Sequence, residues 1–497
     1  MTSEESTRNR DSVDFVRKEP PHSIFDRKQK WLIIVIVSTA ATCKALAFFS
    51  GFASNIYFPA LPTIAKDLGV SLELVNLTVT SYLIFQGLAP SLWGPVSDVK
   101  GRRVAYIGTF IVFVGACIGL AETKNYATLI VLRCLQSTGS ASTIAIGSGV
   151  IGDITTRADR GGFMGIFQAG LLVPVAVGPV IGGSLAGSLG WRAIFWFLTI
   201  YGGVFLILLI LVLPETLRSV VSNGGLQPSN RLQRFPLNVY QRHTSVQWNS
   251  ADVPELPPKK RINVLGPFCI LANKFAAPII MFLAVYYAVW QMSITAMSSL
   301  FESRYGLGET HIGLTFIANG VGSMVGTLIT GKILDIDYRR IKNKFQADVE
   351  NNNVNEENFP IEKARLRLVP VFSVLQCISL IVFGWTIQYR VHIAVPVITT
   401  FVTGWTAVSM QSTIMTYLVD LFPEKSAAAS ARLNLARCLF AAGGTSFIMP
   451  MINGVGSGVA FTICVGVQLI SLVAPFIQWK FAASWRQKEL NSQQHIH

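Results

Sequence analysis

The sequence predicts an all-α integral membrane protein whose twelve transmembrane helices form two similar bundles of six. Three observations predict it. Of the 497 residues, 51% are apolar and only 14% are charged, which suits a chain whose solvent is largely lipid. Apolar runs of roughly 20 residues, long enough to cross a hydrocarbon core of about 30 Å, recur along the chain. A charged loop motif also occurs twice, once in each half.

The apolar runs give the expected helices in order. An N-terminal bundle (31–213) contains spans 31–53, 75–96, 104–121, 126–150, 163–187 and 193–213, and a C-terminal bundle (276–480) contains spans 276–301, 312–331, 368–387, 391–416, 428–451 and 458–479. Polar segments separate them: an N-terminal tail (1–30), a central loop (214–275) rich in Ser, Asn, Pro and Arg, an insert (341–366), and a C-terminal tail (481–497). A soluble core could not bury twelve such runs.

The distribution of Lys and Arg predicts the orientation. Of 41 such residues, five lie in expected outer loops (Lys66, Lys124, Arg192, Arg304 and Arg390), and four lie inside apolar runs or at their ends (Lys44, Arg133, Lys332 and Arg437). The other 32 lie in segments that are cytosolic if the N-terminus is cytosolic. Because positive residues stay inside, both termini are expected in the cytosol. The net charge of +14 then faces anionic inner-leaflet lipids rather than nucleic acid.

Several other classes of protein are disfavoured. The seven cysteines are scattered without metal-ligand spacing, so we expect no metal site and no cofactor. No GxxxxGK[ST] loop is present for a primary pump, and no His or acid cluster stands near a candidate nucleophile, so the chain is not expected to be an enzyme. A membrane receptor is disfavoured because the polar segments lack apolar periodicity.

The loop after the second span reads GPVSDVKGRR, and the loop after the eighth reads GKILDIDYRR. They share the spacing of one Gly, one Asp and an Arg pair: Gly94, Asp98, Arg102 and Arg103 in the first, and Gly331, Asp335, Arg339 and Arg340 in the second. Two copies in register predict a parallel structural repeat. The second copy carries Tyr338 in place of Gly101, which puts the tight glycine turn there in doubt.

With these motifs the chain resembles the major facilitator superfamily, whose signature loop has the form G-x-x-x-D-x-x-G-R-R. The fourth span adds Arg133, Gln136 and Gly139, and the fifth adds Gly178, Pro179, Gly182 and Gly183, which resemble the antiporter motif of drug exporters. The segments NIYFPALP (55–62) and FPIEKAR (359–365) look like the fungal twelve-span drug:proton antiporters, including the quinidine-resistance type. The major facilitator fold is therefore expected.

The resemblance implies that the repeated loop acts as a conformational latch. Its expected members are Gly94, Asp98, Gly101, Arg102, Arg103, Gly331, Asp335, Arg339 and Arg340, with Asp153 and Asp420 as partners at the ends of the fourth and tenth spans. Asp98 can accept charge-assisted hydrogen bonds from helix-end amides or from Arg102. The alternative is that these are solvated helix-end charges that only stabilise topology.

Polar residues inside apolar runs predict the transport pathway. Arg133 should face the bundle interior, because an unpaired cation in lipid costs several kcal/mol, and Gln136 shares its helix face. The expected pathway comprises Lys44, Gln86, Arg133, Gln136, Gln168, Tyr287, Trp290, Gln291, Asn319, Gln411, Asn434 and Arg437. The aromatic cluster of the seventh span would suit a flat, apolar or cationic substrate, or it is packing. Arg133 is alternatively a structural arginine.

The leading prediction is proton-coupled export of small amphipathic compounds, drugs or weak acids, by alternating access. The alternative is an importer or facilitator of a nutrient. No carboxylate lies at mid-membrane depth, so proton coupling is implied by the resemblance, with Asp98 and Asp153, or Lys44, as the groups that could carry it. The expected partners are a small-molecule substrate, protons and the lipid bilayer, and the protein is expected to act as a monomer in the plasma membrane.

Overall fold

The computed structural model describes residues 23–39, 49–156, 173–228, 230–244, 277–352, 361–421 and 426–478. Within these ranges the regular elements are all helices. Nine of the described helices are long and apolar enough to cross a membrane, and each of the twelve expected spans overlaps at least one described helix. The predicted all-α membrane architecture agrees with this pattern.

The N-terminal group of helices follows the expected order. Its members are α1 (Arg27–Thr39), α2 (Phe49–Asn55), η1 (Phe58–Ala60), α3 (Leu61–Leu68), α4 (Leu72–Lys100), α5 (Arg102–Ala121), α6 (Tyr126–Ile154), α8 (Val173–Leu189) and α9 (Arg192–Val212). The first expected span is thus represented by α1 and α2. Lys44, between them, and Gln168, before α8, lie outside the described residues.

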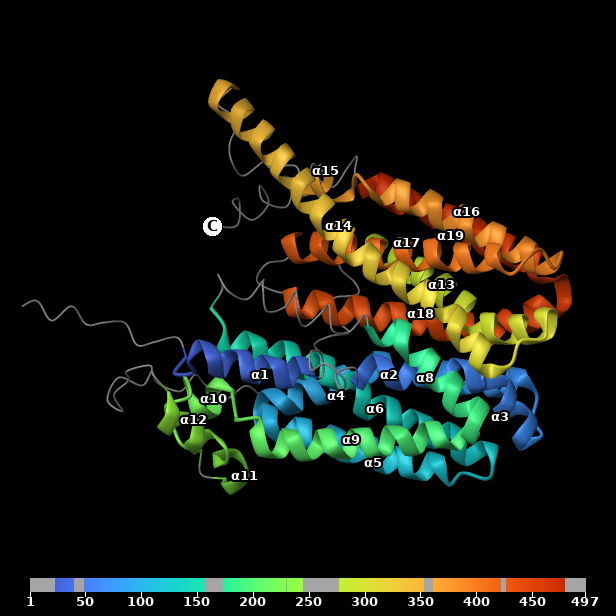
Figure 1. The fold of residues 1–497 in the computed structure, drawn as a ribbon. Helices are drawn as coiled ribbons and strands as arrows, with labels where there is room; N and C mark the ends of the chain where they lie inside the picture. The colour runs from blue at the N-terminus through green and yellow to red at the C-terminus, as the bar shows by residue number, and fades with distance from the viewer. Residues whose placement is uncertain are drawn as a thin grey trace, which may run out of the picture.

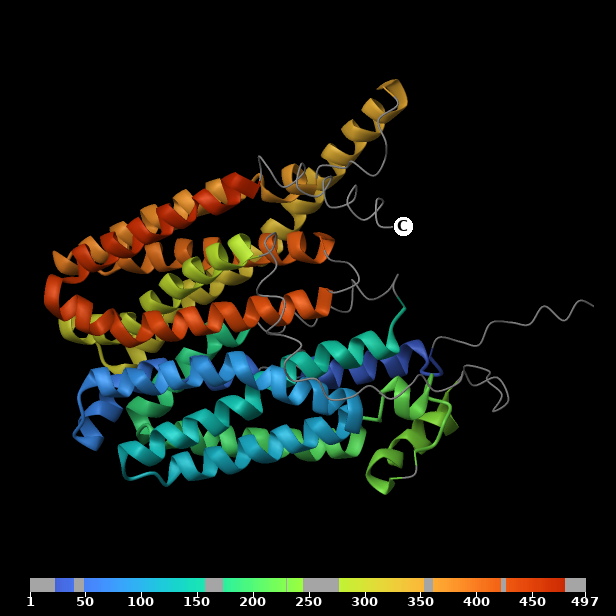
Figure 2. The ribbon, with the colours of Figure 1, turned by 180° about the vertical axis from the view of Figure 1, so that it is seen from behind.

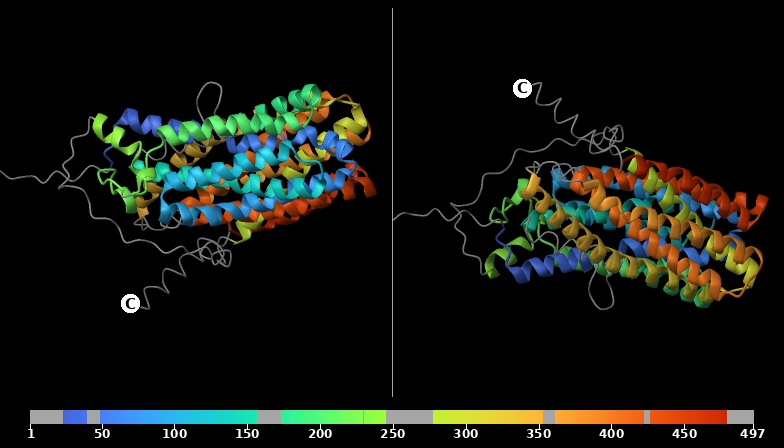
Figure 3. Two further views of the ribbon diagram at one scale, coloured as in Figure 1. Left: turned by 90° about the horizontal axis from the view of Figure 1, so that it is seen from below. Right: turned by 90° about the horizontal axis from the view of Figure 1, so that it is seen from above.

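The C-terminal group contains α13 (Ala277–Tyr305), α14 (Glu309–Asn352), α15 (Ile361–Leu366), α16 (Val369–Gln388), α17 (Ala394–Leu421), α18 (Ser426–Val455) and α19 (Ser457–Ser471). The two groups lie side by side along a common axis (Figures 1 and 2). Figure 3 shows the N-terminal group from below and the C-terminal group from above, with the long helices of each running in the same general direction.

Two helix pairs make most of the contact between the groups: α8 packs against α14, and α4 packs against α18. We call the end of the molecule that carries α3 the α3 end, and the opposite end, which carries α12 (Leu237–His243), the α12 end. The helices of the C-terminal group fan away from the N-terminal group toward the α12 end (Figures 1 and 2).

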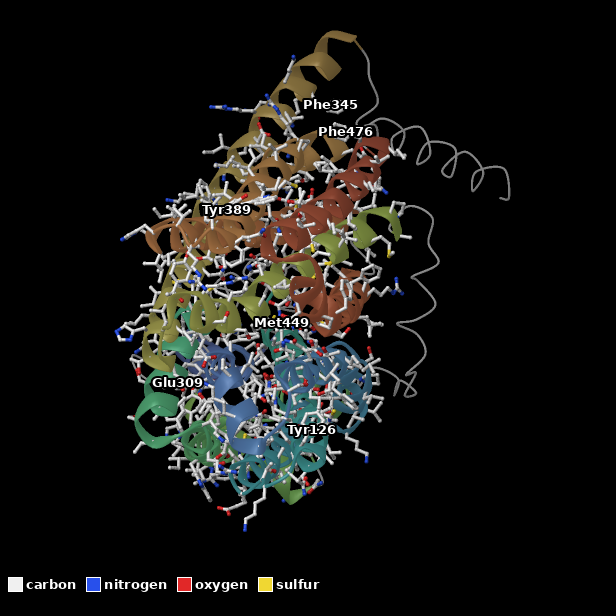
Figure 4. All side chains as sticks on the ribbon, turned by 90° about the vertical axis from the view of Figure 1, so that its right-hand side faces the viewer. Tyr126, Glu309, Phe345, Tyr389, Met449 and Phe476 are labelled. Atoms are coloured by element: carbon white, nitrogen blue, oxygen red, sulfur yellow. The ribbon has the colours of Figure 1, made fainter. Side chains whose placement is uncertain are left out.

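Polar side chains join the two groups at the α3 end. Lys66 Nζ lies 2.5 Å from Glu302 Oε1, and Thr63 donates a hydrogen bond to Glu309. Figure 4, which looks onto this end, shows Glu309 where the groups meet. Each ion pair found at the α12 end, in contrast, joins residues of the same group. The described contacts therefore fasten the two groups together at the α3 end.

Two polar segments are more ordered than the sequence predicts. The expected insert 341–366 begins as a continuation of α14, which runs to Asn352. The expected central loop 214–275 contains α10 (Arg218–Val221), α11 (Arg231–Arg234) and α12. Phe25 is buried and packs edge to face on Tyr240 of α12, at a centroid distance of 5.8 Å. These buried contacts explain why a composition that reads as a linker is ordered here.

Candidate functional site

The first copy of the repeated loop brings together three residues of the predicted latch, Asp98, Arg102 and Asp153. α4 ends at Lys100, Gly101 turns the chain with φ of 112°, and α5 begins at Arg102. A side chain would be strained at that φ, so the turn requires glycine. Arg102 Nη1 lies 2.5 Å from Asp98 Oδ1, and its Nε lies 2.9 Å from Asp153 Oδ2. One guanidinium thus links the end of α4 to the end of α6 through two carboxylates.

Glu215 supports this loop, although it was not among the predicted site residues. Its fully buried carboxylate accepts hydrogen bonds at Oε1 from the backbone N–H groups of Arg102 (2.9 Å), Thr216 (3.0 Å) and Leu217 (3.0 Å). It therefore caps the start of α5, where backbone donors lack helical partners. Burial raises the pKa of Glu215. The sequence signal was the Pro214-Glu215-Thr216 run after the sixth span.

Arg103 and Gly94, two other residues of the first loop, lie in different surroundings. Arg103 is buried and donates to the carbonyl oxygens of Ile210 (2.6 Å) and Leu213 at the end of α9. It thus ties α5 to α9. No atom lies within 4 Å of where a Cβ on Gly94 or Gly331 would stand, so neither glycine marks a close approach of neighbouring groups in this conformation.

The second copy of the repeated loop differs from the first. α14 continues as a helix through Tyr338, and the side chains of Arg339 and Arg340 are exposed. Nothing is described of the Asp335 side chain. Asp420, at the end of α17, pairs instead with Arg365 of α15, with 2.8 Å between Oδ2 and Nε. The predicted Arg pair and Asp420 are therefore not brought together.

Arg133 lies at the centre of a buried polar cluster in the N-terminal group. Its Nη1 donates to Gln136 Oε1 at 2.6 Å, and its guanidinium carbon lies 4.0 Å from the ring centroid of Tyr57 and 4.4 Å from that of Tyr82. Among the described residues no carboxylate pairs with Arg133, and its Nε has no hydrogen-bond partner. The predicted pair Arg133 and Gln136 is thus adjacent, within an aromatic box.

Arg437 of α18 has similar neighbours in the C-terminal group, although it is only half-buried. Its Nε and Nη2 donate to Asn434 Oδ1 at 3.1 and 2.8 Å, and its guanidinium carbon lies 4.8 Å from the ring centroid of Tyr287. Tyr287 packs edge to face on Trp290, with 5.5 Å between the centroids. Trp290 Nε1 is buried without a hydrogen-bond partner among the described residues. Four predicted pathway residues therefore form one cluster.

This cluster touches the boundary between the groups. Asn434 Nδ2 donates to the backbone oxygen of Gln86 on α4, at 3.5 Å. Nearby on the same helix pair, the hydroxyls of Thr80 and Thr445 are 3.1 Å apart. An arginine already covers one face of the Tyr287 ring, so this part of the aromatic cluster is poorly suited to a cationic substrate.

Other predicted pathway residues lie apart from the two arginine clusters. Asn319 is buried and donates to the backbone oxygen of Thr400 at 3.1 Å, which joins α14 to α17. Gln291 is buried on α13, and Gln411 is half-buried on α17. No group of three or more potential metal-binding side chains occurs in the part of the chain that the structure describes.

The predicted antiporter motif lies on α8, which packs against α2 of its own group and against α14 of the C-terminal group. A Cβ on Gly182 would overlap the backbone of Ile56, and a Cβ on Gly183 would overlap the backbone of Glu309 at the start of α14. Gly178 likewise faces Asn55 and Ile56, and the backbone oxygen of Pro179 lies against Gly313. Small residues here allow close approach of two backbones, as in other membrane helix pairs.

Comparisons with known proteins identify the family. A model of the Major Facilitator Superfamily matches residues 45–445. Citrate exporter 1 of Aspergillus niger is 37% identical over 475 residues, which cover 94% of this chain and 89% of that protein. The MFS antiporter QDR2 of Candida albicans is 38% identical over 451 residues, which cover 90% of this chain and 88% of that protein.

Two solved structures share the fold. The xylose transporter XylE from E. coli, in a partially occluded inward-open conformation, matches with a TM-score of 0.59 and 14% identity, covering 91% of this chain and 99% of that chain. The human organic anion transporter MFSD10 matches with a TM-score of 0.55 and 15% identity, covering 90% and 99%. The chain therefore belongs to the Major Facilitator Superfamily of multi-pass membrane transporters, among the fungal relatives that QDR2 and citrate exporter 1 represent.

Proposed function

We propose that the protein exports small organic anions, including amphipathic weak acids, from the cytosol by proton-coupled alternating access across the plasma membrane. The observation that carries the proposal is the half-buried guanidinium of Arg437 beside the boundary between the two groups, which is bound to an amide and an aromatic ring and, among the described residues, to no carboxylate. The A. niger relative, named a citrate exporter, supports the same class of substrate.

The energetics of a partly buried cation favour an anionic ligand at Arg437. An ion removed from water without a counter-ion carries a penalty of several kcal/mol. A cation–π contact offsets on the order of 2 kcal/mol of that when it is desolvated. Bidentate binding of a carboxylate by a guanidinium supplies the missing charge with matched geometry. An anion would therefore gain more from this site than a neutral or cationic compound.

We infer the orientation from the distribution of Lys and Arg, which favours a cytosolic position for the α12 end. The Lys66–Glu302 and Thr63–Glu309 contacts at the α3 end then close the outer side, and the groups separate toward the cytosolic side. In this conformation a substrate would load from the cytosol, as export requires. Asp98 and Asp153 share one guanidinium, so protonation of either carboxylate would weaken a contact between α4, α5 and α6. This triad is the candidate for proton coupling.

The proposal is tested by transport of radiolabelled citrate and benzoate in proteoliposomes with an imposed pH gradient. We expect transport that depends on the gradient and falls at least tenfold in Arg437→Gln, with Arg437→Lys between the two. Arg304→Gln, which removes an exposed arginine, should leave the rate within twofold.

Three outcomes would contradict the proposal. Unchanged transport of both anions in Arg437→Gln would remove the anion site. Transport of a lipophilic cation such as tetraphenylphosphonium, without transport of either anion, would assign a cationic substrate. Equal rates with and without the pH gradient would identify a facilitator instead of a proton-coupled exporter.

A further inference from the structure

The two halves contain the same ion pair but take its arginine from different places in the chain. In the N-terminal group, Arg102 Nε lies 2.9 Å from Asp153 Oδ2, and the Arg102 side chain is 11% exposed. In the C-terminal group, Arg365 Nε lies 2.8 Å from Asp420 Oδ2, and the Arg365 side chain is 10% exposed. Both carboxylates stand at corresponding places, near the ends of α6 and α17.

The residue at position 338 explains the change of arginine. Gly101 turns the chain sharply between α4 and α5, so Arg102 begins α5 and reaches Asp153. Tyr338 holds the equivalent place in the second motif, and a tyrosine would be strained at the backbone angles that Gly101 adopts. The helix therefore continues past Tyr338, which carries Arg339 and Arg340 into exposed positions.

Arg365 returns to this place from the far side of the insert. It lies in α15, just before α16, and its guanidinium carbon stacks 4.2 Å from the ring centroid of Tyr338. Tyr338, which stands in place of the turn glycine, thus contacts the arginine that pairs with Asp420. α15 packs against both α14 and α17, so Arg365 links the same two helices that the motif would have linked.

We propose that Arg365, rather than Arg339 or Arg340, is the gating arginine of the C-terminal half, and that its pair with Asp420 holds the cytosolic surface that meets the N-terminal half when the inner side closes. This assignment rests on the alternating-access transport proposed above. The Arg365 side chain is 10% exposed and that of Asp420 is 31% exposed, so loss of this charge-assisted pair should matter more than loss of a fully exposed arginine.

The test measures conformation without any substrate. Spin labels on Lys100→Cys and Lys342→Cys, both exposed at the α12 end on opposite groups, report the distance between the halves in a background without native cysteines. In this labelled protein, before any further substitution, we expect two populations, one with a long distance and one with a shorter distance. Arg365→Gln and Asp420→Asn should deplete the shorter population at least threefold, while Arg339→Gln and Arg340→Gln leave it unchanged.

A charge exchange separates the ion pair from a general loss of folding. Arg365→Asp combined with Asp420→Arg should restore the shorter population, and each variant's melting temperature and gel-filtration profile establish that it is folded. Equal depletion by Arg339→Gln or Arg340→Gln, or an unchanged distribution in folded Arg365→Gln, would overturn the assignment. If the distances change as expected while wild type transports neither citrate nor benzoate, the anion-export proposal fails and the gate assignment stands.

Discussion

At the scale of single residues, two arginines of the described spans, Arg133 and Arg437, are surrounded by neutral amides and aromatic rings. Arg133 illustrates this arrangement, since two tyrosine rings and the Gln136 amide surround its guanidinium. Cation–π contacts and hydrogen bonds to neutral oxygens reduce the desolvation penalty without cancelling the charge. Such an arginine remains attractive to anions and depends on the planar shape of its head group.

We therefore expect Arg133→Lys to reduce anion transport about tenfold, although it keeps the charge. A compact ammonium cannot face both rings and donate to Gln136 as a planar guanidinium does. Transport of citrate or benzoate in proteoliposomes measures the loss, with Arg390→Lys at an exposed loop position as the control. Full activity of Arg133→Lys would show that only the charge matters.

Glu215 gives a second prediction at this scale. Glu215→Ala leaves buried backbone donors at the start of α5 without an acceptor, which costs on the order of 1–3 kcal/mol. Burial raises the pKa of Glu215, so the folded protein favours the neutral carboxylic acid. The stability that this preference contributes is present below the ordinary Glu pKa and is lost as pH rises through the raised pKa. Glu215→Gln, which keeps a neutral acceptor, should melt well above Glu215→Ala at pH 7. Equal melting temperatures would contradict the capping role.

At the scale of elements, the crossing of α8 and α14 is the main contact between the two halves. It is built from glycines whose absent side chains let the two backbones touch, with Gly183 against Glu309 and Gly313 against Pro179. Dispersion between closely packed backbones is what holds helices together where lipid removes the hydrophobic drive. If the two halves rock against each other during transport, α8 and α14 must stay in close contact while the angle between them changes.

Gly183→Ala tests this crossing. The added methyl group would overlap the backbone of Glu309, so we expect a lower melting temperature and at least a fivefold loss of transport. The matched control is Gly203→Ala on α9, where no atom lies within 4 Å of the added carbon. That change should be neutral or stabilising by up to about 1 kcal/mol, because alanine favours helix. Equal effects of the two changes would assign the loss to helix propensity alone.

At the scale of the whole molecule, the two groups are joined by polar contacts at one end and separate toward the other. Transport by alternating access requires the α3 end to open while the α12 end closes. The contacts at the α3 end are between exposed or half-buried side chains, and exposed ion pairs contribute only about 0–1 kcal/mol each. Closure of this kind can be reversed within a transport cycle.

A covalent link across the α3 end should therefore stop transport. With Lys66→Cys and Glu302→Cys, one residue in each half, a short bifunctional thiol reagent should abolish at least nine-tenths of the activity. The control is the pair Asp67→Cys and Arg192→Cys, because the Arg192–Asp67 ion pair at the same end lies within one half. Linking that pair should leave transport intact, and inhibition by both links would contradict the rocking of the two halves.

The sequence by itself determined the class of fold, the order of the helices and the repeated loop, because lipid imposes long apolar runs and a repeat in register is visible in the chain. Tertiary structure decided the rest. It assigned the partner of Asp420 to Arg365 instead of Arg339 or Arg340, since one tyrosine in place of glycine carried the helix straight on. It also brought the Glu215 carboxylate to the backbone N–H of Arg102 and the Arg437 guanidinium to the face of the Tyr287 ring. Such contacts join residues distant in the chain, and their geometry depends on helix packing that no local pattern encodes.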